Sequence, residues 1–333
     1  MLKFKKNKRV KNRNIISIAL FSVFLFFLIT ITPLVFTYYK NRISTIQSME
    51  YNNNKTYARH YALILEELDS DFNNSIYEGA KLRGESLNSY VEKFGNNLPF
   101  SYDVYDRLNM AIAAKVDGII VEGGGNKDID ALIDRAFDSG IPVITVIKDS
   151  PNSKRICFIG AGRYQLGKTY GQQILGLINN HTLNIIVLSD SDTISANPDM
   201  MLAGLKDTLA DANVEIQMIP IDRKNTFSSE ETIHNIIMNS DNFPDVIVCL
   251  NAVDTISAYQ TLVDNNQVGK INIIGYYNSD IILSAIEKDI IHSTIVVDTK
   301  QMGTYCIDAL DEYIKSNRVS EYFTVDIDTY WSP

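Results

Sequence analysis

The segment from residue 116 to 146 constrains the fold most, because it has the pattern of one βαβ unit. Two β-branched apolar runs, Val116 to Val121 and Ile141 to Val146, flank a stretch with helical spacing. Strands of continuous apolar residues are typical of parallel sheets that helices cover on both faces. Gly140 follows the helix, where we expect the left-handed conformation that glycine adopts without a Cβ penalty. Open parallel sheets bind ligands beyond the carboxyl ends of their strands, so the residues after each strand are the first candidates for a site.

Alternation of strand and helix continues along most of the chain after residue 57. Further apolar strand runs, each followed by a segment with helical spacing, are ICFIG (156–160), NIIVLSD (184–190), DVIVCLN (245–251) and INIIGYY (271–277). Such alternation predicts an α/β fold with parallel sheets covered by helices on both faces. Residues 57–333 are too many for one small core and fit two lobes.

The N-terminal part of the chain predicts a membrane anchor. No charged residue occurs from Asn14 to Tyr39, and this mostly apolar stretch is long enough to span a bilayer. Seven Lys or Arg residues precede it, whereas Lys40 and Arg42 follow it, so we expect the N-terminus in the cytoplasm and the remainder outside. The segment is too long for a cleaved signal peptide and lacks an A-x-A site, which favours an uncleaved signal anchor.

The net charge of the part expected outside the cell disfavours binding to nucleic acids. The chain has a net charge of −9, and without its seven N-terminal basic residues the remainder carries about 16 net negative charges. Such a protein binds phosphate backbones poorly, so small solutes are the expected partners. Cys157, Cys249 and Cys306 are odd in number, and two lie in apolar strand runs, which predicts buried and unpaired thiols.

Several short segments after residue 57 follow one another in a characteristic order. They are EGAK (78–81), VDGIIV (116–121), SGIPVITV (139–146), YQLGKTYGQQI (164–174), AGL (203–205), DVIVCLN (245–251), INIIGY (271–276) and STIVVDTKQMG (293–303). In this order and spacing they resemble the type I periplasmic binding proteins, the ribose-binding class of solute-binding proteins. The resemblance implies two Rossmann-like lobes with parallel sheets, joined by three crossovers, that close by a hinge on a solute in the cleft.

The resemblance, together with the N-terminal pattern, implies domain boundaries. We expect a basic cytoplasmic tail at residues 1–13, a transmembrane signal anchor at 14–39 and a stalk at 40–56. The N-terminal lobe is expected to comprise residues 57–161 and 298–322, and the C-terminal lobe residues 162–297 and 323–333. Repressor function is not expected, because a membrane span replaces the DNA-binding headpiece of the related regulators.

Carried over position by position, the contacts of the family's sugar binders are only partly kept. The acid and arginine that grip sugar hydroxyls fall on Ile147 and Lys148, and the acid usual after INIIGY falls on Tyr277. Asn251 agrees with the family pattern, whereas the glutamine usual near the last hinge falls on Val297. A site without paired donors and acceptors disfavours a polyol such as ribose. A larger or less polar sugar derivative fits better, as does a ligand with a positive charge.

The candidate ligand contacts are aromatic, amide and charged side chains that follow predicted strands. They are Asp69, Ser70, Phe72, Asn73, Glu122, Lys148, Asp149, Asn251, Tyr277, Asn278 and Asp298. Phe72 keeps one ring that could stack on a ligand face. For each candidate the alternative is that it caps a helix or faces solvent, and the sequence leaves this open.

Other signals in the chain are weaker. Residues 162–169, GRYQLGKT, satisfy the phosphate-loop pattern but lack a glycine-rich nest, so we expect a helix start in which Gly167 and Gly171 allow close packing. GGG at 123–125 lacks the dinucleotide-binding spacing and predicts a turn at the cleft rim. The four histidines are scattered and no nucleophile elbow occurs. We therefore expect no metal site, no cofactor and no enzymatic activity.

These observations predict a membrane-tethered extracytoplasmic solute-binding protein for a sugar or sugar-like small molecule. Two membrane partners fit: an ABC permease that receives the solute, or a sensor histidine kinase that reads the closed lobes. A fixed anchor favours sensing, because it keeps the partner at high local concentration. The alternatives are a non-binding or weakly binding interaction scaffold and an extracytoplasmic enzyme on the same fold.

Overall fold

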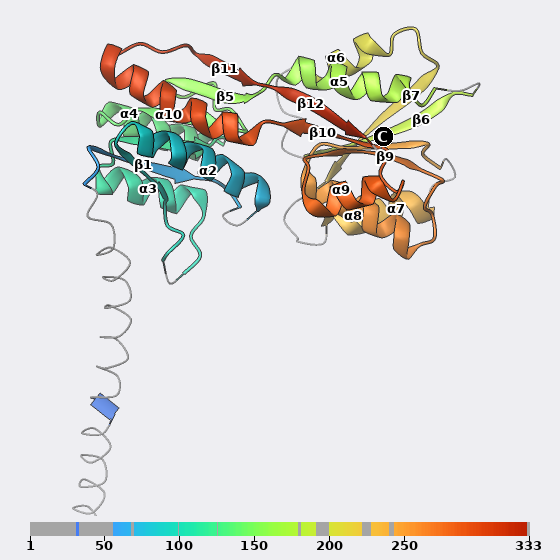
Figure 1. Cartoon of the computed structure of the whole chain (residues 1–333), viewed down its shortest axis with the longest axis horizontal. Helices are drawn as coiled ribbons and strands as arrows, with labels where there is room; N and C mark the ends of the chain where they lie inside the picture. Colours follow the sequence, from blue (N-terminus) through green and yellow to red (C-terminus); the bar gives the residue numbers. More distant parts are fainter. Residues whose placement is uncertain are drawn as a thin grey trace, which may run out of the picture. The chain divides into compact units, whose positions relative to one another are not determined.

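The structure is a computed structural model that describes residues 31–32, 56–67, 70–98, 100–124, 126–178, 181–190, 200–221, 228–239 and 243–331 (Figure 1). Residues 57–333 form one compact unit and residues 1–56 another. Of the predicted tail, anchor and stalk, the described residues are 31–32, which are helical, and Thr56; the rest of that prediction lies outside the described residues. Among the residues that are described, no helix has both the length and the apolar character needed to cross a membrane.

The first lobe of the unit 57–333 is built on a six-stranded parallel sheet. In sheet order its strands are β11 (Tyr322–Val325), β5 (Cys157–Ala161), β4 (Val143–Val146), β3 (Gly118–Glu122), β1 (Arg59–Ile64) and β2 (Ser89–Lys93). Its helices are α2 (Asp71–Ser86), α3 (Val104–Ala114), α4 (Lys127–Asp138) and α10 (Thr299–Ser316). The predicted βαβ unit is present as β3, α4 and β4, and Gly140 has a φ of +85°, as predicted.

The second lobe repeats this plan with a second six-stranded sheet. In sheet order its strands are β12 (Ile327–Trp331), β10 (Ser293–Val297), β9 (Asn272–Tyr276), β8 (Val246–Cys249), β6 (Leu183–Asp190) and β7 (Val214–Ile221). Its helices are α5 (Arg163–Leu175), α6 (Met200–Thr208), α7 (Ser228–Asn239), α8 (Ala252–Asp264) and α9 (Asp280–Glu287). All neighbours pair in parallel except β12, which runs antiparallel to β10 (Figure 1).

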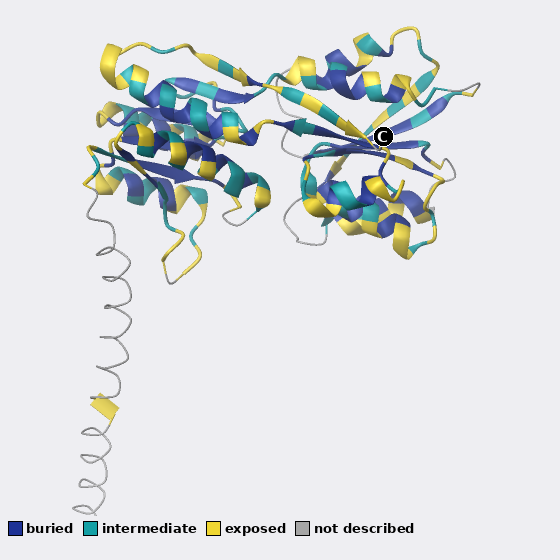
Figure 2. Ribbon diagram, in the orientation of Figure 1, coloured by how far each residue is buried: buried dark blue, intermediate teal, exposed yellow. Residues whose placement is uncertain are grey.

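Both sheets are buried on both faces, which explains why their central strands are continuous apolar runs (Figure 2). In β3, Ile120 packs with α2 and α10, whereas its neighbours Ile119 and Val121 pack with α3 and α4 on the opposite face. In the second sheet α5 and α6 cover one face, and α7, α8 and α9 cover the other. The three cysteines are unpaired and fully buried in these cores, as predicted.

The chain crosses between the two sheets three times. The crossings fall at Gly162 between β5 and α5, at Asp298 between β10 and α10, and at Asp326 between β11 and β12. From the sequence, the third boundary is expected at residues 322–323. Because β11 pairs with β5, residues 323–325 belong instead to the first lobe, and the crossing lies further along the chain.

Each lobe contains one pair of helices whose backbones touch at glycines. In α5, a Cβ on Gly167 would lie 1.9 Å from the Met201 carbonyl oxygen of α6, so the predicted close packing is present. In α2 and α10, a Cβ on Gly79 would lie 2.2 Å from the Lys300 oxygen, and one on Gly303 would lie 2.0 Å from the Ile76 oxygen. Residues 163–169 of the phosphate-loop-like segment are the first turns of α5, not a phosphate-binding loop.

Candidate functional site

The candidate residues lie at the carboxyl ends of strands in both lobes, where the sequence placed them. Those of the first lobe follow β1, β3 and β4, and those of the second lobe follow β8, β9 and β10. Asp69 lies outside the described residues. Contact of these residues with a ligand stays a prediction.

A buried ion pair joins three strand ends of the first lobe. Glu122, at the end of β3, is 7% exposed, and its Oε1 lies 3.1 Å from the Lys148 Nζ. The same Nζ lies 2.7 Å from Glu66 Oε2, and the Glu66 backbone N–H donates to Glu122 Oε2 at 2.9 Å. Glu66 is not among the residues predicted from the sequence, although its place shortly after the β1 strand is a signal that could have identified it.

Burial and the neighbouring charges together determine the pKa values of Glu122 and Lys148. Burial raises the pKa of Glu122, and the charge of Lys148 offsets part of that effect. Burial also works against the Lys148 ammonium, but the nearby carboxylates of Glu122 and Glu66 outweigh it, so the pKa of Lys148 lies above its ordinary value. Lys148 is therefore a fixed cation that holds two carboxylates, and a carboxylate oxygen of Glu122 is a buried hydrogen-bond acceptor.

Asp149, the neighbour of Lys148, serves the lobe's own structure. Its Oδ1 accepts from the Thr145 hydroxyl at 2.9 Å and from the Ser150 N–H at 2.8 Å. Its Oδ2 accepts from Arg155 Nη2 at 2.8 Å, and the Arg155 side chain is 3% exposed. The guanidinium also lies 4.9 Å from the ring centre of Tyr322. Both carboxylate oxygens thus have protein partners.

The first turn of α2 combines a cap with buried polar and aromatic side chains. Ser70 is the N-cap, and its hydroxyl accepts from the Asn73 N–H at 3.3 Å. Asn73 is 6% exposed, and its side-chain amide donates to the Glu67 carbonyl. This bond ties the first turn of α2 to the segment after β1.

Aromatic rings from the two lobes meet at this turn. The Phe72 ring of the first lobe lies 5.2 Å from the Tyr277 ring at an interplanar angle of 65°, and 5.9 Å from the Tyr276 ring. Tyr277 is 8% exposed. Burial raises the pKa of Tyr277, and the carboxylate of Asp71 raises it further, so its phenol stays protonated at neutral pH.

In the second lobe Asn251 is oriented by a buried carboxylate. Asn251 is the N-cap of α8: its Oδ1 accepts from the Asp254 N–H at 2.8 Å, and its Nδ2 donates to Asp254 Oδ2 at 2.6 Å. The Ser229 hydroxyl donates to Asp254 Oδ1 at 2.7 Å, which ties the start of α7 to the same group. An amide nitrogen carries two hydrogens, so Asn251 keeps one for another acceptor.

The last two candidates are more exposed. Asn278 is exposed directly after Tyr277. Asp298 is exposed and is the N-cap of α10, where its Oδ1 accepts from the Gln301 N–H at 2.8 Å. Capping accounts for Ser70 and Asp298 without a ligand. Within the described part of the chain, no three His, Cys, Asp or Glu side chains are grouped as metal ligands.

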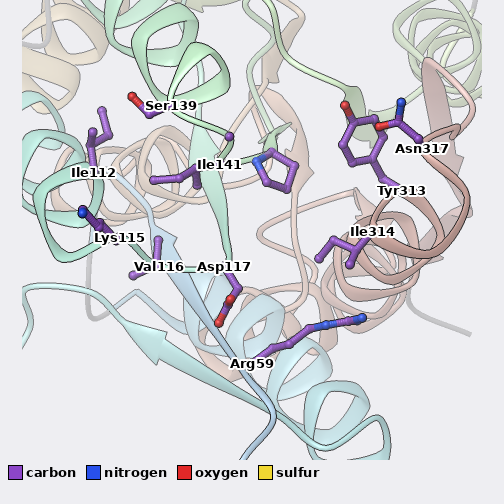
Figure 3. A pocket seen from close by; sticks show the side chains of 12 residues that line it. Arg59, Ile112, Lys115, Val116, Asp117, Ser139, Ile141, Tyr313, Ile314 and Asn317 are labelled. Carbon is purple, nitrogen blue, oxygen red and sulfur yellow. The ribbon is translucent and has the colours of Figure 1, made fainter.

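A separate hollow lies at the other end of the first lobe (Figure 3). It has a volume of about 630 Å³ and is lined by Arg59, Ile112, Lys115, Val116, Asp117, Ser139, Gly140, Ile141, Pro142, Tyr313, Ile314 and Asn317. These residues lie at the amino ends of β1, β3 and β4 and at the carboxyl ends of α3, α4 and α10. None of them is a sequence-predicted site residue. The candidate residues lie instead at the carboxyl ends of the strands, in both lobes.

Comparison with known proteins gives a family and a fold. The sequence model of the periplasmic binding protein domain matches residues 61–318. No curated protein sequence matches the chain.

Solved structures share the fold. The glucose-galactose binding protein GanP from Geobacillus stearothermophilus is 22% identical, with a TM-score of 0.72, over 82% of this chain and 97% of that one. A sugar-binding protein of a sugar ABC transporter from Bacillus halodurans is 20% identical, with a TM-score of 0.69, over 82% and 97%. A XylFII–LytSN complex matches at 21% identity, with a TM-score of 0.68, over 82% and 97%.

Proposed function

The chain belongs to the periplasmic binding protein domain family, and from this premise we propose that it binds a sugar or sugar-like solute in the cleft between its lobes. One observation carries the proposal: polar and aromatic side chains lie at the carboxyl ends of strands in both lobes, and Phe72 of the first lobe contacts Tyr277 of the second. The relevant groups are Phe72, Asn73 and Glu122 of the first lobe and Asn251 and Tyr277 of the second. Related solved structures include a glucose-galactose binding protein and the sugar-binding protein of an ABC transporter.

These residues supply the chemistry that a sugar needs. Rings such as Phe72 offer an apolar face to the C–H face of a sugar, and Glu122 offers a desolvated acceptor to a hydroxyl. Asn251 offers its remaining amide hydrogen, and Asn73 its carbonyl oxygen. A solute that contacts both lobes binds the closed arrangement more tightly than the open one, so binding shifts the chain towards closure.

Thermal unfolding of the full-length chain tests this proposal. The chain is held in a detergent without a sugar head group and heated with pentoses, hexoses, sugar phosphates, nucleosides and cationic metabolites in turn. A solute that binds only the folded chain adds about 2.7 kcal/mol of stability at a hundredfold excess over its dissociation constant. We expect a raised midpoint with at least one sugar or sugar derivative. A panel without any shift contradicts the proposal and favours an interaction scaffold.

We further propose that the chain presents its closed lobes to a membrane partner, either an ABC permease or a sensor histidine kinase. The structure of XylFII with LytSN supports recognition of this fold by a second protein, and the ABC-transporter structure supports delivery. Cross-linking of the full-length chain in its native membrane, with and without the solute, distinguishes the two. A solute-dependent cross-link to permease subunits indicates delivery, and one to a kinase indicates sensing. The proposal is contradicted if the solute produces no cross-link to a permease subunit or to a kinase.

The tether is also a proposal. We propose that residues 14–39 anchor the chain with its N-terminus in the cytoplasm and residues 57–333 outside, because this uncharged stretch follows seven basic residues. Protease added to intact cells stripped of their outer layers tests the orientation. We expect loss of the large domain and survival of a short N-terminal fragment in the membrane. Protection of the whole chain until the membrane is opened contradicts the orientation.

A further inference from the structure

One strand end in each lobe, on the carboxyl side of its sheet, carries a residue with a left-handed backbone. Ile147 follows β4 with a φ of +67°, and Tyr277 follows β9 with a φ of +76°. Such a conformation is a steric outlier for a β-branched or bulky residue. Each residue donates its N–H to the next strand, Ile147 to the Ile159 oxygen at 3.1 Å and Tyr277 to the Ile295 oxygen at 2.7 Å. Each lobe therefore has one strained, left-handed residue directly after a strand, held by a hydrogen bond to the neighbouring strand.

At Tyr277 the surrounding structure fixes the strained turn from both sides. Besides its N–H bond to β10, its carbonyl accepts from the Thr294 hydroxyl at 2.7 Å, and Thr294 is fully buried. Strain of this kind persists only where neighbouring bonds over-determine it. The direction of the Tyr277 side chain is therefore set by the second lobe's own sheet and does not depend on the first lobe.

That direction brings the ring against the other lobe. The Tyr277 and Phe72 ring centres are 5.2 Å apart, edge to face, and Tyr276 adds a second ring 5.9 Å from Phe72. Phe72 belongs to α2 and packs against the first lobe's core, to which Tyr276 is also packed. These rings thus make an apolar contact between the two lobes from the chain's own side chains.

We propose that the contact between Phe72 and Tyr277 is a closing contact built into the chain, which biases the empty lobes towards the closed arrangement. The inference rests on the proposed function and concerns the regulation of the same cleft. A contact made in only one of two conformations shifts their equilibrium towards that conformation. An aromatic pair of this kind shifts it roughly twofold to tenfold. The solute then has to supply only the rest of the free energy that closes the lobes.

Distances between spin labels on the two lobes of the full-length, ligand-free chain test this inference. Cysteines introduced by Leu82→Cys in α2 and Val263→Cys in α8 are suitable, because both sites are exposed, at 62% and 41%. The native cysteines are fully buried and do not compete for the label. The variant is Phe72→Ala. The matched control is Tyr305→Ala, which removes a ring contact of 5.7 Å with Phe323 inside the first lobe.

We expect Phe72→Ala to increase the ratio of long to short distances by roughly twofold to tenfold. Tyr305→Ala and Tyr277→Phe, which keeps the ring, should leave the distribution of the parent chain unchanged. Phe72→Leu keeps apolar volume without a ring, and it replaces Phe72→Ala if that variant does not fold. Distances equal to the parent's in the Phe72 variant, or an equal change in the Tyr305 control, overturn the inference. Because no solute is present, the result does not depend on the outcome of the solute panel.

Discussion

At the scale of single residues, the pair of buried Glu122 and half-buried Lys148 is the most consequential feature of the first lobe's strand ends. The Glu122 side chain is 8% exposed, so it relies on the ammonium for its charge balance. Removing one partner of a buried pair leaves the other charge uncompensated. The Lys148 side chain is 41% exposed, which admits water and reduces the effect.

We predict that Lys148→Met lowers the free energy of unfolding at pH 7 by about 1–2 kcal/mol, less than in a fully buried pair. Without the ammonium, burial raises the pKa of Glu122 further above that of an unfolded glutamate. A carboxyl group with a raised folded-state pKa binds its proton more tightly in the folded chain, so stability increases as the pH falls through that pKa. The deficit of the variant should therefore shrink between pH 7 and pH 5.

Urea unfolding at both pH values measures this difference. Lys154→Met is the matched control, because Lys154 pairs with Asp138 at 2.7 Å on the exposed surface, and we expect little change. A Lys148 deficit that stays constant from pH 7 to pH 5 would show that burial of Glu122 is not its cause.

A second prediction concerns Lys115, the left-handed C-cap of α3. Its φ is +54° and its side chain is exposed, so glycine would relieve backbone strain with little loss of contact. We expect Lys115→Gly to raise the free energy of unfolding by about 0.5–1 kcal/mol. Lys81→Gly, within α2, should lower it by about 1 kcal/mol. Urea unfolding of both variants checks the opposite signs, and a loss in both would contradict the role assigned to the left-handed cap.

Residue by residue, the sequence predicts where the candidates lie better than what they do. Ser70, Asn251 and Asp298 follow strands as predicted, yet all three cap helices. The reason is physical: a residue between a parallel strand and its helix is close to any ligand and also at the helix N-terminus, where Ser, Asn and Asp are favoured. The partners of Glu122 and Tyr277 come from distant parts of the chain, so no local pattern could predict them.

At the scale of elements, the glycine contacts between helices determine how closely α2 approaches α10. The atom that a Cβ on Gly79 would meet, the Lys300 oxygen at 2.2 Å, belongs to the backbone and cannot rotate away. We predict that Gly79→Ala lowers the free energy of unfolding by about 1–3 kcal/mol, although alanine favours a helix more than glycine does.

Gly176→Ala at the end of α5 is the matched control for this change. Gly176 has an ordinary helical φ of −66°, and its Cβ would lie 3.3 Å from the nearest oxygen. We expect that variant to be as stable as the parent chain or more stable in urea. Equal stability of Gly79→Ala and the parent would show that the two helices can separate without cost.

Most helices and strands were predictable from the sequence. Continuous apolar runs indicate buried strands, and apolar residues at helical spacing indicate amphipathic helices. The exception is the C-terminal pair, β11 and β12. The run from residue 322 to 331 lies at sheet edges and is mostly exposed or half-buried, so it has no continuous apolar run to mark where one strand ends. Strand pairing with β5, not local sequence, decides that residues 322–325 belong to the first lobe.

At the scale of the whole molecule, the two six-stranded sheets and the family match agree with the fold that the sequence resembles. Two places on the first lobe could accept a small molecule: the carboxyl ends of its strands and the hollow at their amino ends. They share no residue. We propose that the solute binds at the carboxyl ends, where candidate side chains of the second lobe also lie.

Isothermal titration of the full-length chain with the best solute of the panel tests this assignment most directly. It compares Phe72→Ala, at the carboxyl ends, with Tyr313→Ala, in the wall of the hollow. We predict that Phe72→Ala weakens binding about tenfold through loss of ring contact, and that Tyr313→Ala binds as the parent does. Weakened binding in the Tyr313 variant, with unchanged binding in the Phe72 variant, would contradict the account and place the solute in the hollow.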